Sequence, residues 1–582
     1  MRRTKIVVTL GPATDNEKVL IKLIDAGMNV ARCNFSHADY EEHLNRVKML
    51  KKVCKKTGKK VSLLMDTKGP EIRTGHFENG KISLEASNQV TLTTEDVLGN
   101  EKLIPVTYAK LPKVVIPGTE ILLDDGLINL KVIKIIDNKN VLCEIFNSGE
   151  IKDRRGVNIP NFSIDLPNPT DKDKKDIMFA IENDFDYIAV SFVQDSDTIL
   201  EFKKILRKNG GEKIQVVAKI ENYTGVNNFD SILSVADGIM VARGDLGVEL
   251  PLEEVPIVQK EFIKKCFMAG KPVITATQLL HSMIDNPRPT RAEVSDIANA
   301  IYDLTSAVML SGETSIGKYA VKCVETMSTV AKRAEEAIDY RNIYMHMLSN
   351  FFAGKDVTNA VTNAALTTAY EIQASAIITV TETGYTARML SKLRPKMPII
   401  AITTEEKVAR QLQLNWGITP IVGEKYNSID KLHYAAVKLP LEAGLIEKGD
   451  IVVIVAGVPV GITGATNLIK VETVGDVLVK GETVTGGIVT GRVCIARTKD
   501  ELKLDFIKND IVVIKHLEES FYPFLKKANG LIIEDDDIDG KAKIIGNTLD
   551  IPVIKNARAA MDILKDGTMV KLDADEAQVI KI

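Results

Sequence analysis

Residues 215–221 read QVVAKIE, and residues 238–243 read GIMVAR. Each run is short, β-branched and apolar until its last residues, which is typical of a buried strand in a parallel sheet. Six similar runs occur within the first 335 residues: KIVVTLG (5–11), VARCNF (30–35), VSLLMDT (61–67), YIAVSF (187–192), PVITAT (272–277) and SAVMLS (306–311). Longer amphipathic stretches separate most of them, so the pattern indicates βα units around a parallel sheet.

Polar side chains mark the carboxyl ends of these eight runs. They are Asn34, Ser36, Asp66, Lys219, Glu221, Arg243, Asp245, Thr277 and Ser311. In a TIM (β/α)8 barrel, catalytic residues lie at the carboxyl ends of the strands. The sequence therefore predicts an α/β fold built on a TIM barrel, with a site at that rim.

The rest of the chain divides into further parts. The gap between the third and fourth strands is too long for one crossover helix and contains strand-like runs such as VLCEIF. We expect an inserted small β-barrel there, placed to close over the barrel as a lid. A new α/β pattern follows, and then a Gly- and Val-rich unit. The expected parts are the barrel over 1–70 and 168–352, the lid over 71–167, an α/β domain over 353–473, and a C-terminal β/α domain over 474–582.

Composition excludes several classes of protein. The chain has 582 residues, with 75 basic and 78 acidic side chains and a net charge of −3. This balance provides no electrostatic footprint for nucleic acid or an anionic membrane. Six cysteines occur without CxxC spacing, and no stretch of about 20 apolar residues is present. We expect a cytoplasmic protein that binds neither nucleic acid nor membrane.

The most informative segment is Lys219-Ile220-Glu221, at the end of a predicted strand. Residues two apart on a strand point the same way, so Lys219 and Glu221 both face the barrel mouth. Asp245, beyond the next strand, adds a second carboxylate. Two carboxylates with water and substrate oxygens suit Mg²⁺, and a lysine beside them offsets charge on a transferring phosphoryl group. The alternative is a set of ordinary ion pairs at the rim.

Other residues are candidates for binding anions or a monovalent cation. Arg32 and Arg73 are candidate phosphate clamps, although each alone also fits a surface arginine. The backbone N–H groups of Gly244 and Asp245 are placed to bind a carboxylate where a short helix begins. Oxygens suited to a monovalent cation, or to ordinary helix capping, lie on neighbouring loops at Asn34, Ser36, Asp66 and Thr67.

Two glycine-containing loops remain. Residues 312–319, GETSIGKY, fit GxxxxGK but end in tyrosine where a Walker A loop needs Ser or Thr, so we reject that interpretation. Residues 381–386, TETGYT, combine hydroxyl groups with a helix start. They fit either a phosphate site away from the barrel or a plain helix cap.

The motifs together resemble the pyruvate kinase family across about residues 1–473. The segments that carry the resemblance are TKIVVTLGPAT, ARCNFSH, MDTKGPEIRTG, DDGLI, RRGVNIP, KIEN, MVARGDLGVE, ATQLLHSM, NPRPTRAEVSDIANA, AVMLSGET and TGYTARMLSKLRP. The resemblance implies transfer of a phosphoryl group from phosphoenolpyruvate to ADP, giving pyruvate and ATP in the last step of glycolysis. It also implies Mg²⁺ (or Mn²⁺), K⁺, a phosphorylated effector and a homotetramer.

Residue roles follow from the same resemblance. It implies catalysis by Lys219, Thr277, Ser311 and Arg73, and substrate binding by Arg32, Lys219, Gly244, Asp245 and Thr277. It implies nucleotide binding by Asn34, His37, Arg73 and Arg155, Mg²⁺ at Glu221 and Asp245, and K⁺ at Asn34, Ser36, Asp66 and Thr67. Glu71 matches the potassium-dependent branch, and Thr381, Thr383, Gly384 and Thr386 match the effector phosphate loop, with Pro459 to Thr463 as its neighbour.

The tail from about residue 475 resembles the swivelling domain of phosphoenolpyruvate-utilising enzymes. Where that domain carries the phosphorylated histidine, this chain reads Asp539-Gly540-Lys541. Because lysine cannot replace that histidine, we expect a structural or regulatory tail. There are two competing hypotheses. One is a phosphohistidine phosphotransferase, against which Lys541 argues. The other is a catalytically silent metabolite-binding protein, against which the intact set of Lys219, Glu221 and Asp245 argues.

Overall fold

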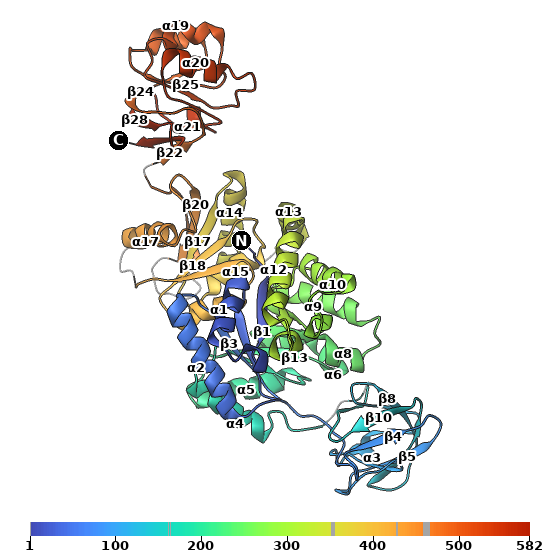
Figure 1. Ribbon diagram of the computed structural model, residues 1–582. Helices are drawn as coiled ribbons and strands as arrows, with labels where there is room; N and C mark the ends of the chain where they lie inside the picture. The colour runs from blue at the N-terminus through green and yellow to red at the C-terminus, as the bar shows by residue number, and fades with distance from the viewer. Residues whose placement is uncertain are drawn as a thin grey trace. The chain divides into compact units, whose positions relative to one another are not determined.

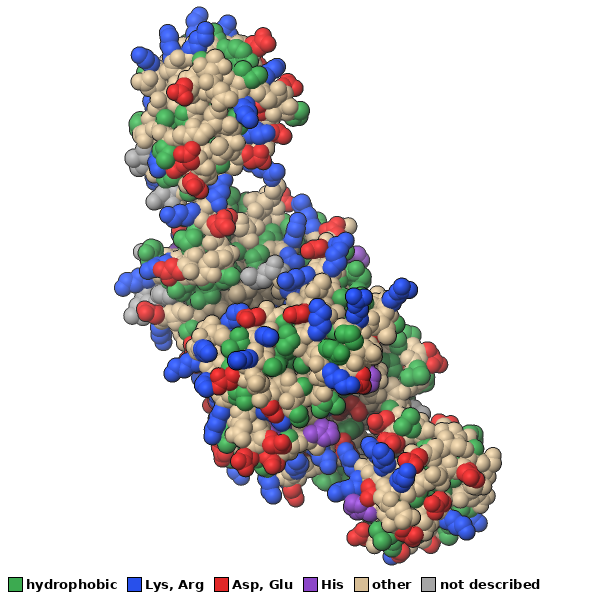
Figure 2. All heavy atoms as spheres, in the orientation of Figure 1, with side chains coloured by type: hydrophobic (Ala, Val, Ile, Leu, Met, Phe, Trp, Pro, Cys, Tyr) green, Lys and Arg blue, Asp and Glu red, His purple; other side chains and the backbone are tan. Residues whose placement is uncertain are grey.

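The computed structural model describes residues 2–160, 162, 165–350, 356–425, 429–457, 466–475 and 477–581. The chain forms two compact units. The first comprises residues 1–353 and 382–422, and the second comprises residues 354–381 and 423–582. On the face shown in Figure 2, acidic and basic side chains lie interspersed on both units.

Eight parallel strands form a closed barrel in the first unit, which confirms the predicted TIM barrel. In spatial order the strands run β1-β16-β15-β14-β13-β12-β3-β2. Their bounds are β1 Lys5–Thr9, β2 Val30–Asn34, β3 Ser62–Asp66, β12 Tyr187–Val190, β13 Gln215–Ile220, β14 Gly238–Ala242, β15 Val273–Ala276 and β16 Ala307–Leu310. Each matches one of the eight apolar runs in the sequence.

Amphipathic helices surround the strands (Figure 1). The main ones are α1 Glu17–Ala26, α2 Tyr40–Thr57, α4 Asp171–Glu182, α5 Ser196–Lys208, α7 Phe229–Val235, α9 Val255–Ala269, α10 Arg291–Tyr302 and α12 Ala320–Glu336. Helix α2 shows how the sequence sets their limits. Asp39 and Glu42 form a capping box at its start, and Gly58, at φ +69°, ends it.

Side chains fill the inside of the barrel. Buried residues from its strands form one cluster, which includes Leu64, Tyr187, Val217, Met240 and Ile274. Branched and bulky side chains of this kind make the interior of a TIM barrel a packed core rather than a pore. Polar chemistry is therefore confined to the rims.

The inserted segment between β3 and α4 is rich in β-structure, as expected. A six-stranded sheet has the order β11-β7-β8-β9-β5-β6, and a two-stranded ribbon pairs β10 with β4. The bounds are β4 Lys81–Leu84, β5 Gln89–Thr93, β6 Leu103–Pro105, β7 Glu120–Leu123, β8 Ile128–Ile135, β9 Asn140–Ile145, β10 Gly149–Lys152 and β11 Val157–Asn158, with one short helix, α3 Leu111–Val114. Both sheets contribute to a single buried core.

The remaining α/β elements divide between the two units. The first unit holds α15 Tyr385–Lys392, α16 Glu406–Gln411 and the parallel pair β18 Ile399–Thr403 with β19 Ile418–Val422. The second holds α14 Val357–Glu371, β17 Ala376–Val380, α17 Ile429–Glu442, β20 Ile451–Gly457 and β21 Thr466–Thr473, with β17 parallel to β20 and β21 antiparallel to it.

An eight-stranded mixed sheet makes up the tail, in the order β22-β29-β28-β24-β25-β26-β27-β23. Its strands are β22 Val477–Lys480, β23 Glu482–Thr485, β24 Ile488–Ala496, β25 Ile511–Ile514, β26 Gly530–Ile533, β27 Val553–Lys555, β28 Met569–Asp573 and β29 Gln578–Lys581, and helices α18 Lys499–Asp505 and α20 Lys541–Leu549 accompany them. In the described parts of the chain, no helix is both long and apolar enough to cross a bilayer.

The filled barrel interior leads to a stability prediction. Met240 is fully buried there, and replacing it with alanine leaves a cavity that the surrounding strands cannot close. We expect Met240→Ala to destabilise the barrel by about 2–5 kcal/mol. The matched control is Met178→Ala on α4, where the side chain is 38% exposed. Thermal unfolding checks this, and equal shifts for both variants would contradict a packed interior.

Candidate active site

Lys219 lies at the centre of a polar cluster at the carboxyl rim of the barrel. Its Nζ is 2.8 Å from Glu221 Oε1 and 3.1 Å from Asp66 Oδ1, and it donates a 2.8 Å hydrogen bond to Ser191 Oγ. The Lys219 side chain is only 11% exposed. Burial by itself lowers the pKa of Lys219, but the carboxylates of Asp66 and Glu221 outweigh it and raise the pKa. The ammonium therefore stays charged.

Asp66 connects Lys219 to Arg32. The Arg32 guanidinium donates from Nε to Asp66 Oδ2 at 2.6 Å and from an Nη to Thr9 Oγ1 at 2.9 Å. Asp66 is fully buried; burial raises its pKa, and the charges of Lys219 and Arg32 more than reverse this and lower it. Asp66 is thus an ionised carboxylate that holds two cations at the rim.

Glu221 and Asp245 form a carboxylate pair beside Lys219. Glu221 Oε2 accepts a 2.6 Å hydrogen bond from the Phe192 N–H, and the Glu221 side chain also hydrogen-bonds to Asp245. Burial, opposed by Lys219, raises the pKa of Glu221. Burial also raises the pKa of Asp245, and Asp125 of the inserted segment adds to this rise.

The donor set fits a divalent cation. Two adjoining carboxyl groups with raised pKa values resist ionising together, and a bound divalent cation would favour the ionised form of both. Within the described ranges, no group of three or more His, Cys, Asp or Glu side chains gathers to hold a metal. Glu221 and Asp245 would therefore supply two ligands, and substrate oxygens and water the others, as Mg²⁺ usually takes them.

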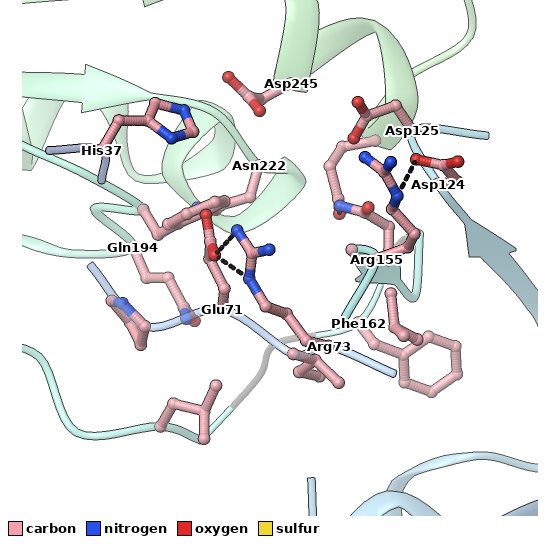
Figure 3. Close-up of a pocket in the computed structure, with 18 residues that line it drawn as sticks. His37, Glu71, Arg73, Asp124, Asp125, Arg155, Phe162, Gln194, Asn222 and Asp245 are labelled. Carbon is pink, nitrogen blue, oxygen red and sulfur yellow. Dashed lines mark hydrogen bonds and ion pairs between the residues drawn. The ribbon is translucent and has the colours of Figure 1, made fainter. Parts of the chain in front are cut away.

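A cavity of about 370 Å³ opens between the barrel rim and the inserted segment (Figure 3). Asp245 and His37 line it from the barrel, and Arg73 and Arg155 line it from the inserted segment. The guanidinium of Arg73 is 2.6 Å from Glu71 Oε2 and donates to the Arg154 carbonyl. Arg155 lies 3.7 Å from Asp124. Both arginines thus line the cavity while paired with acidic side chains. A bound phosphate would have to compete with these carboxylates for the two guanidinium groups.

Thr277 and its neighbours form a second polar group at the rim. The Gly244 N–H donates to Thr277 Oγ1 at 2.9 Å, so this N–H, expected to bind a carboxylate, is engaged within the protein. Arg243 donates to the Thr277 carbonyl at 2.6 Å and holds this residue at φ +67°. Ser311 Oγ is buried and has no hydrogen-bond partner within the described part of the chain. A buried hydroxyl in that state needs a partner from water or substrate.

The four residues proposed for a monovalent cation lie at the ends of two adjacent strands. Asn34 of β2 pairs with Asp66 of β3. Asn34 Oδ1 accepts from the Ser36 N–H at 3.1 Å, and Thr67 Oγ1 accepts from the Ser191 N–H at 3.1 Å. The oxygens are therefore close in the fold, and those of Asp66 are already shared with Arg32 and Lys219.

The residues of the expected effector loop fall in both units. Thr381 directly follows β17 in the second unit, whereas Thr383, Gly384 and Thr386 lie at the start of α15 in the first. Gly384 is the N-cap of α15 at φ +77°, and Arg388 donates to the Thr383 carbonyl. The neighbouring stretch from Pro459 to Thr463 lies outside the described residues.

Sequence reasoning did not single out several rim residues. Ser191 touches Lys219, and Asn158 Nδ2 donates to Glu249 Oε1 at 2.9 Å, joining the inserted segment to α8 Arg243–Glu249. Ser191 follows the apolar run YIAV directly, so its place at a strand end was a usable signal. The Asn158 contact had no such signal, because its partners are far apart in the sequence.

Glu249 leads to a pH prediction. Burial, partly offset by the Asn158 hydrogen bond, raises its pKa from 4.5 to about 7. The native state thus holds this proton more tightly than the unfolded chain, and the resulting stability is lost as pH rises from 4.5 through 7. Because glutamine does not ionise, we expect Glu249→Gln to gain stability relative to the parent between pH 5 and about pH 8.

Thermal unfolding at both pH values measures this effect. Glu253→Gln, at an exposed position nearby, is the control and should follow the parent at each pH. A difference between Glu249→Gln and the parent that stays constant with pH would contradict the prediction.

Comparison with known proteins agrees with this geometry. The chain matches the pyruvate kinase barrel domain over residues 1–324, the pyruvate kinase alpha/beta domain over 359–472, and the mobile domain of PEP-utilising enzymes over 506–577. It is 45% identical over 582 residues to a pyruvate kinase of Bacillus licheniformis, covering 100% of this chain and 99% of the relative. It is 44% identical over 583 residues to one of Staphylococcus aureus, with the same coverage.

A solved structure is similar over most of the chain. A crystal structure of a pyruvate kinase from Cryptosporidium parvum superposes with a TM-score of 0.78 at 41% identity, covering 81% of this chain and 96% of that one. The resemblance inferred from the motifs is therefore confirmed. The chain belongs to the pyruvate kinase family, and this enzyme carries in addition a C-terminal domain that matches the mobile domain of PEP-utilising enzymes.

Proposed function

We propose that this pyruvate kinase transfers the phosphoryl group of phosphoenolpyruvate to ADP and releases pyruvate and ATP, as the last step of glycolysis in the cytoplasm. The observation that carries the proposal is the buried Lys219 ammonium between Asp66 and Glu221, beside a cavity lined by arginines. We also propose a homotetramer and the four-part division into barrel, lid, α/β domain and tail.

Lys219 acts on the charge that develops during transfer. Phosphoryl transfer asks little covalent work of a protein, so positioning and electrostatic stabilisation supply most of the catalysis. The Lys219 ammonium is fixed by three oxygen partners and needs no reorganisation when negative charge appears on the phosphoryl group and the enolate. Mg²⁺ or Mn²⁺, held by Glu221 and Asp245, would neutralise phosphate charge when bound.

The second polar group at the rim is proposed to deliver a proton to the enolate. Thr277 and Ser311 are proposed to carry, through their hydroxyls and water, the proton that converts the enolate to pyruvate. The unpartnered Ser311 hydroxyl supports this role, because a buried hydroxyl without a protein partner can bind such a water.

The other site residues keep their proposed roles. Arg32 and the backbone N–H groups of Gly244 and Asp245 bind phosphoenolpyruvate, the Gly244 N–H exchanging Thr277 Oγ1 for the substrate carboxylate, and Arg73 assists transfer. Asn34, His37, Arg73 and Arg155 bind the nucleotide. K⁺ is bound by Asn34, Ser36, Asp66 and Thr67. An activating sugar phosphate or nucleotide binds at Thr381, Thr383, Gly384 and Thr386.

Lys219→Met tests the proposed mechanism. Removing a fixed cation that faces the developing charge should lower kcat by about 10³-fold, comparable to the loss of a strong transition-state donor, while the chain stays folded. Lys203→Met is the matched control, because Lys203 pairs with Asp237 on the outside of the barrel. A coupled assay of pyruvate release with ADP, Mg²⁺ and K⁺ measures both. Unchanged activity of Lys219→Met would require a different mechanism.

The tail is proposed to be structural or regulatory rather than catalytic. Lys541 begins α20, where Gly540 caps the helix at φ +68°, and it lies 3.6 Å from Asp539. No nucleophilic imidazole stands at this position. The tail's single histidine, His516, lies 3.0 Å from Asp535 and among acidic residues, which disfavours an added phosphate.

A labelling experiment tests the role of the tail. We expect no acid-labile, base-stable phosphate in residues 474–582 after incubation with ³²P-phosphoenolpyruvate and digestion. Label that persists in the tail, and that disappears in His516→Gln, would contradict this assignment and support phosphotransfer through histidine.

A further inference from the structure

His43 is a buried side chain for which neither the motifs nor the proposed mechanism gives a role. It lies in the first turn of α2, is 2% exposed, and stacks on Phe35 with ring centroids 4.1 Å apart and an interplanar angle of 10°. Its Nε2 is 2.9 Å from the carbonyl oxygen of His37. The His43 ring therefore contacts the loop between β2 and α2 in two places.

The surroundings of His43 determine which nitrogen carries the proton. A carbonyl oxygen only accepts, so Nε2 must donate its hydrogen to His37. Nδ1 is buried and has no hydrogen-bond partner among the described residues, so a proton there would be left unsatisfied. The ring is thus the neutral Nε2–H tautomer, in agreement with burial, which lowers the pKa of His43.

The loop that His43 holds carries proposed ligands of both nucleotide and K⁺. It runs from Asn34 to Ala38, and His37 lines the cavity at the barrel mouth. Within the loop, the His37 N–H donates to the Asn34 carbonyl, and Asn34 Oδ1 accepts from the Ser36 N–H. Ala38 follows at φ +67°, a left-handed conformation that a residue with a Cβ adopts only when its surroundings enforce it.

A role in packing alone would not explain this arrangement. A phenylalanine would stack on Phe35 and fill the same space without burying an unsatisfied nitrogen at Nδ1. The imidazole adds one thing, a donor directed at the His37 carbonyl immediately before the strained Ala38. That contact links the start of a rigid helix to the loop.

We propose that His43 is a positioning residue that fixes the Asn34–Ala38 loop, through its hydrogen bond to the His37 carbonyl, in the conformation that binds ADP and K⁺. This rests on the proposed function, because the loop's ligands are assigned there. His43 does not touch substrate. Its effect reaches the cavity through the backbone of His37.

His43→Phe tests the hydrogen bond while keeping the stack on Phe35. Losing one hydrogen bond that orders the loop should raise KM for ADP and the half-activating K⁺ concentration by about fivefold. We expect kcat at saturation and KM for phosphoenolpyruvate to stay within about twofold of the parent. His43→Gln, whose amide N–H can reach the same carbonyl, should restore most of the ADP and K⁺ affinity.

Val47→Ala is the matched control for a general loss of helix packing. Val47 is buried one turn further along the same face of α2, and its side chain carries no hydrogen-bond donor, so its truncation loosens the packing of the helix without altering the donor at His43. We expect its KM for ADP and its K⁺ activation to equal those of the parent. If Val47→Ala reproduces the kinetic changes of His43→Phe, packing and not the hydrogen bond sets the loop, and the inference fails.

Two readouts do not depend on turnover. Calorimetric titration with ADP should show about fivefold weaker binding for His43→Phe. Hydrogen exchange at Ser36 to Ala38 should be faster in that variant and not in Val47→Ala. The inference is overturned if ADP binding and exchange in His43→Phe match the parent, or if His43→Gln behaves as His43→Phe does. A parent enzyme that forms no pyruvate from phosphoenolpyruvate and ADP would instead overturn the proposed function.

Discussion

The charged contacts of Lys219 are the interaction on which the rest of the site depends. Removing an ammonium and two carboxylates from water costs several kcal/mol per ion unless each finds partners. The barrel supplies them by strand order: Lys219 lies on β13, Asp66 ends β3, and Ser191 follows β12, which lies between the two. Closure of the sheet therefore brings together three groups that are far apart in the chain.

The buried ion pairs fix the geometry of the site, but such pairs add little to the stability of the fold. Replacing buried ion pairs with apolar residues often stabilises a protein, so such a cluster is weak evidence for a structural role. Here the charges lie at the open rim, beside a cavity that the inserted segment helps to form. Asn158 of that segment donates a hydrogen bond to Glu249 of the barrel domain, and this contact joins the two sides of the cavity. The charged cluster, the cavity and the inserted segment thus adjoin one another at the carboxyl rim of the barrel.

Much of the barrel was predictable because local pattern and tertiary fold agree. The run QVVAKIE is apolar until Lys219, as a buried parallel strand requires, and the two-residue spacing places Glu221 on the same side. The contacts between individual side chains were harder to predict from the sequence. That Glu71 engages Arg73, and that Thr277 takes the Gly244 N–H, depends on rotamers and loop conformations which no periodicity encodes. The position of Ser191 at a strand end placed it at the rim, but its contact with Lys219 was not encoded in that position.

The central claim is that Glu221 and Asp245, held beside Lys219, form the binding site of one divalent cation. Titration of the folded chain with Mn²⁺, followed by the loss of the free-ion signal in electron paramagnetic resonance, measures this directly. One Mn²⁺ per chain is expected for the parent in the presence of phosphoenolpyruvate, with binding weakened at least tenfold in both Glu221→Gln and Asp245→Asn. Undiminished Mn²⁺ binding in the two folded variants would contradict the account.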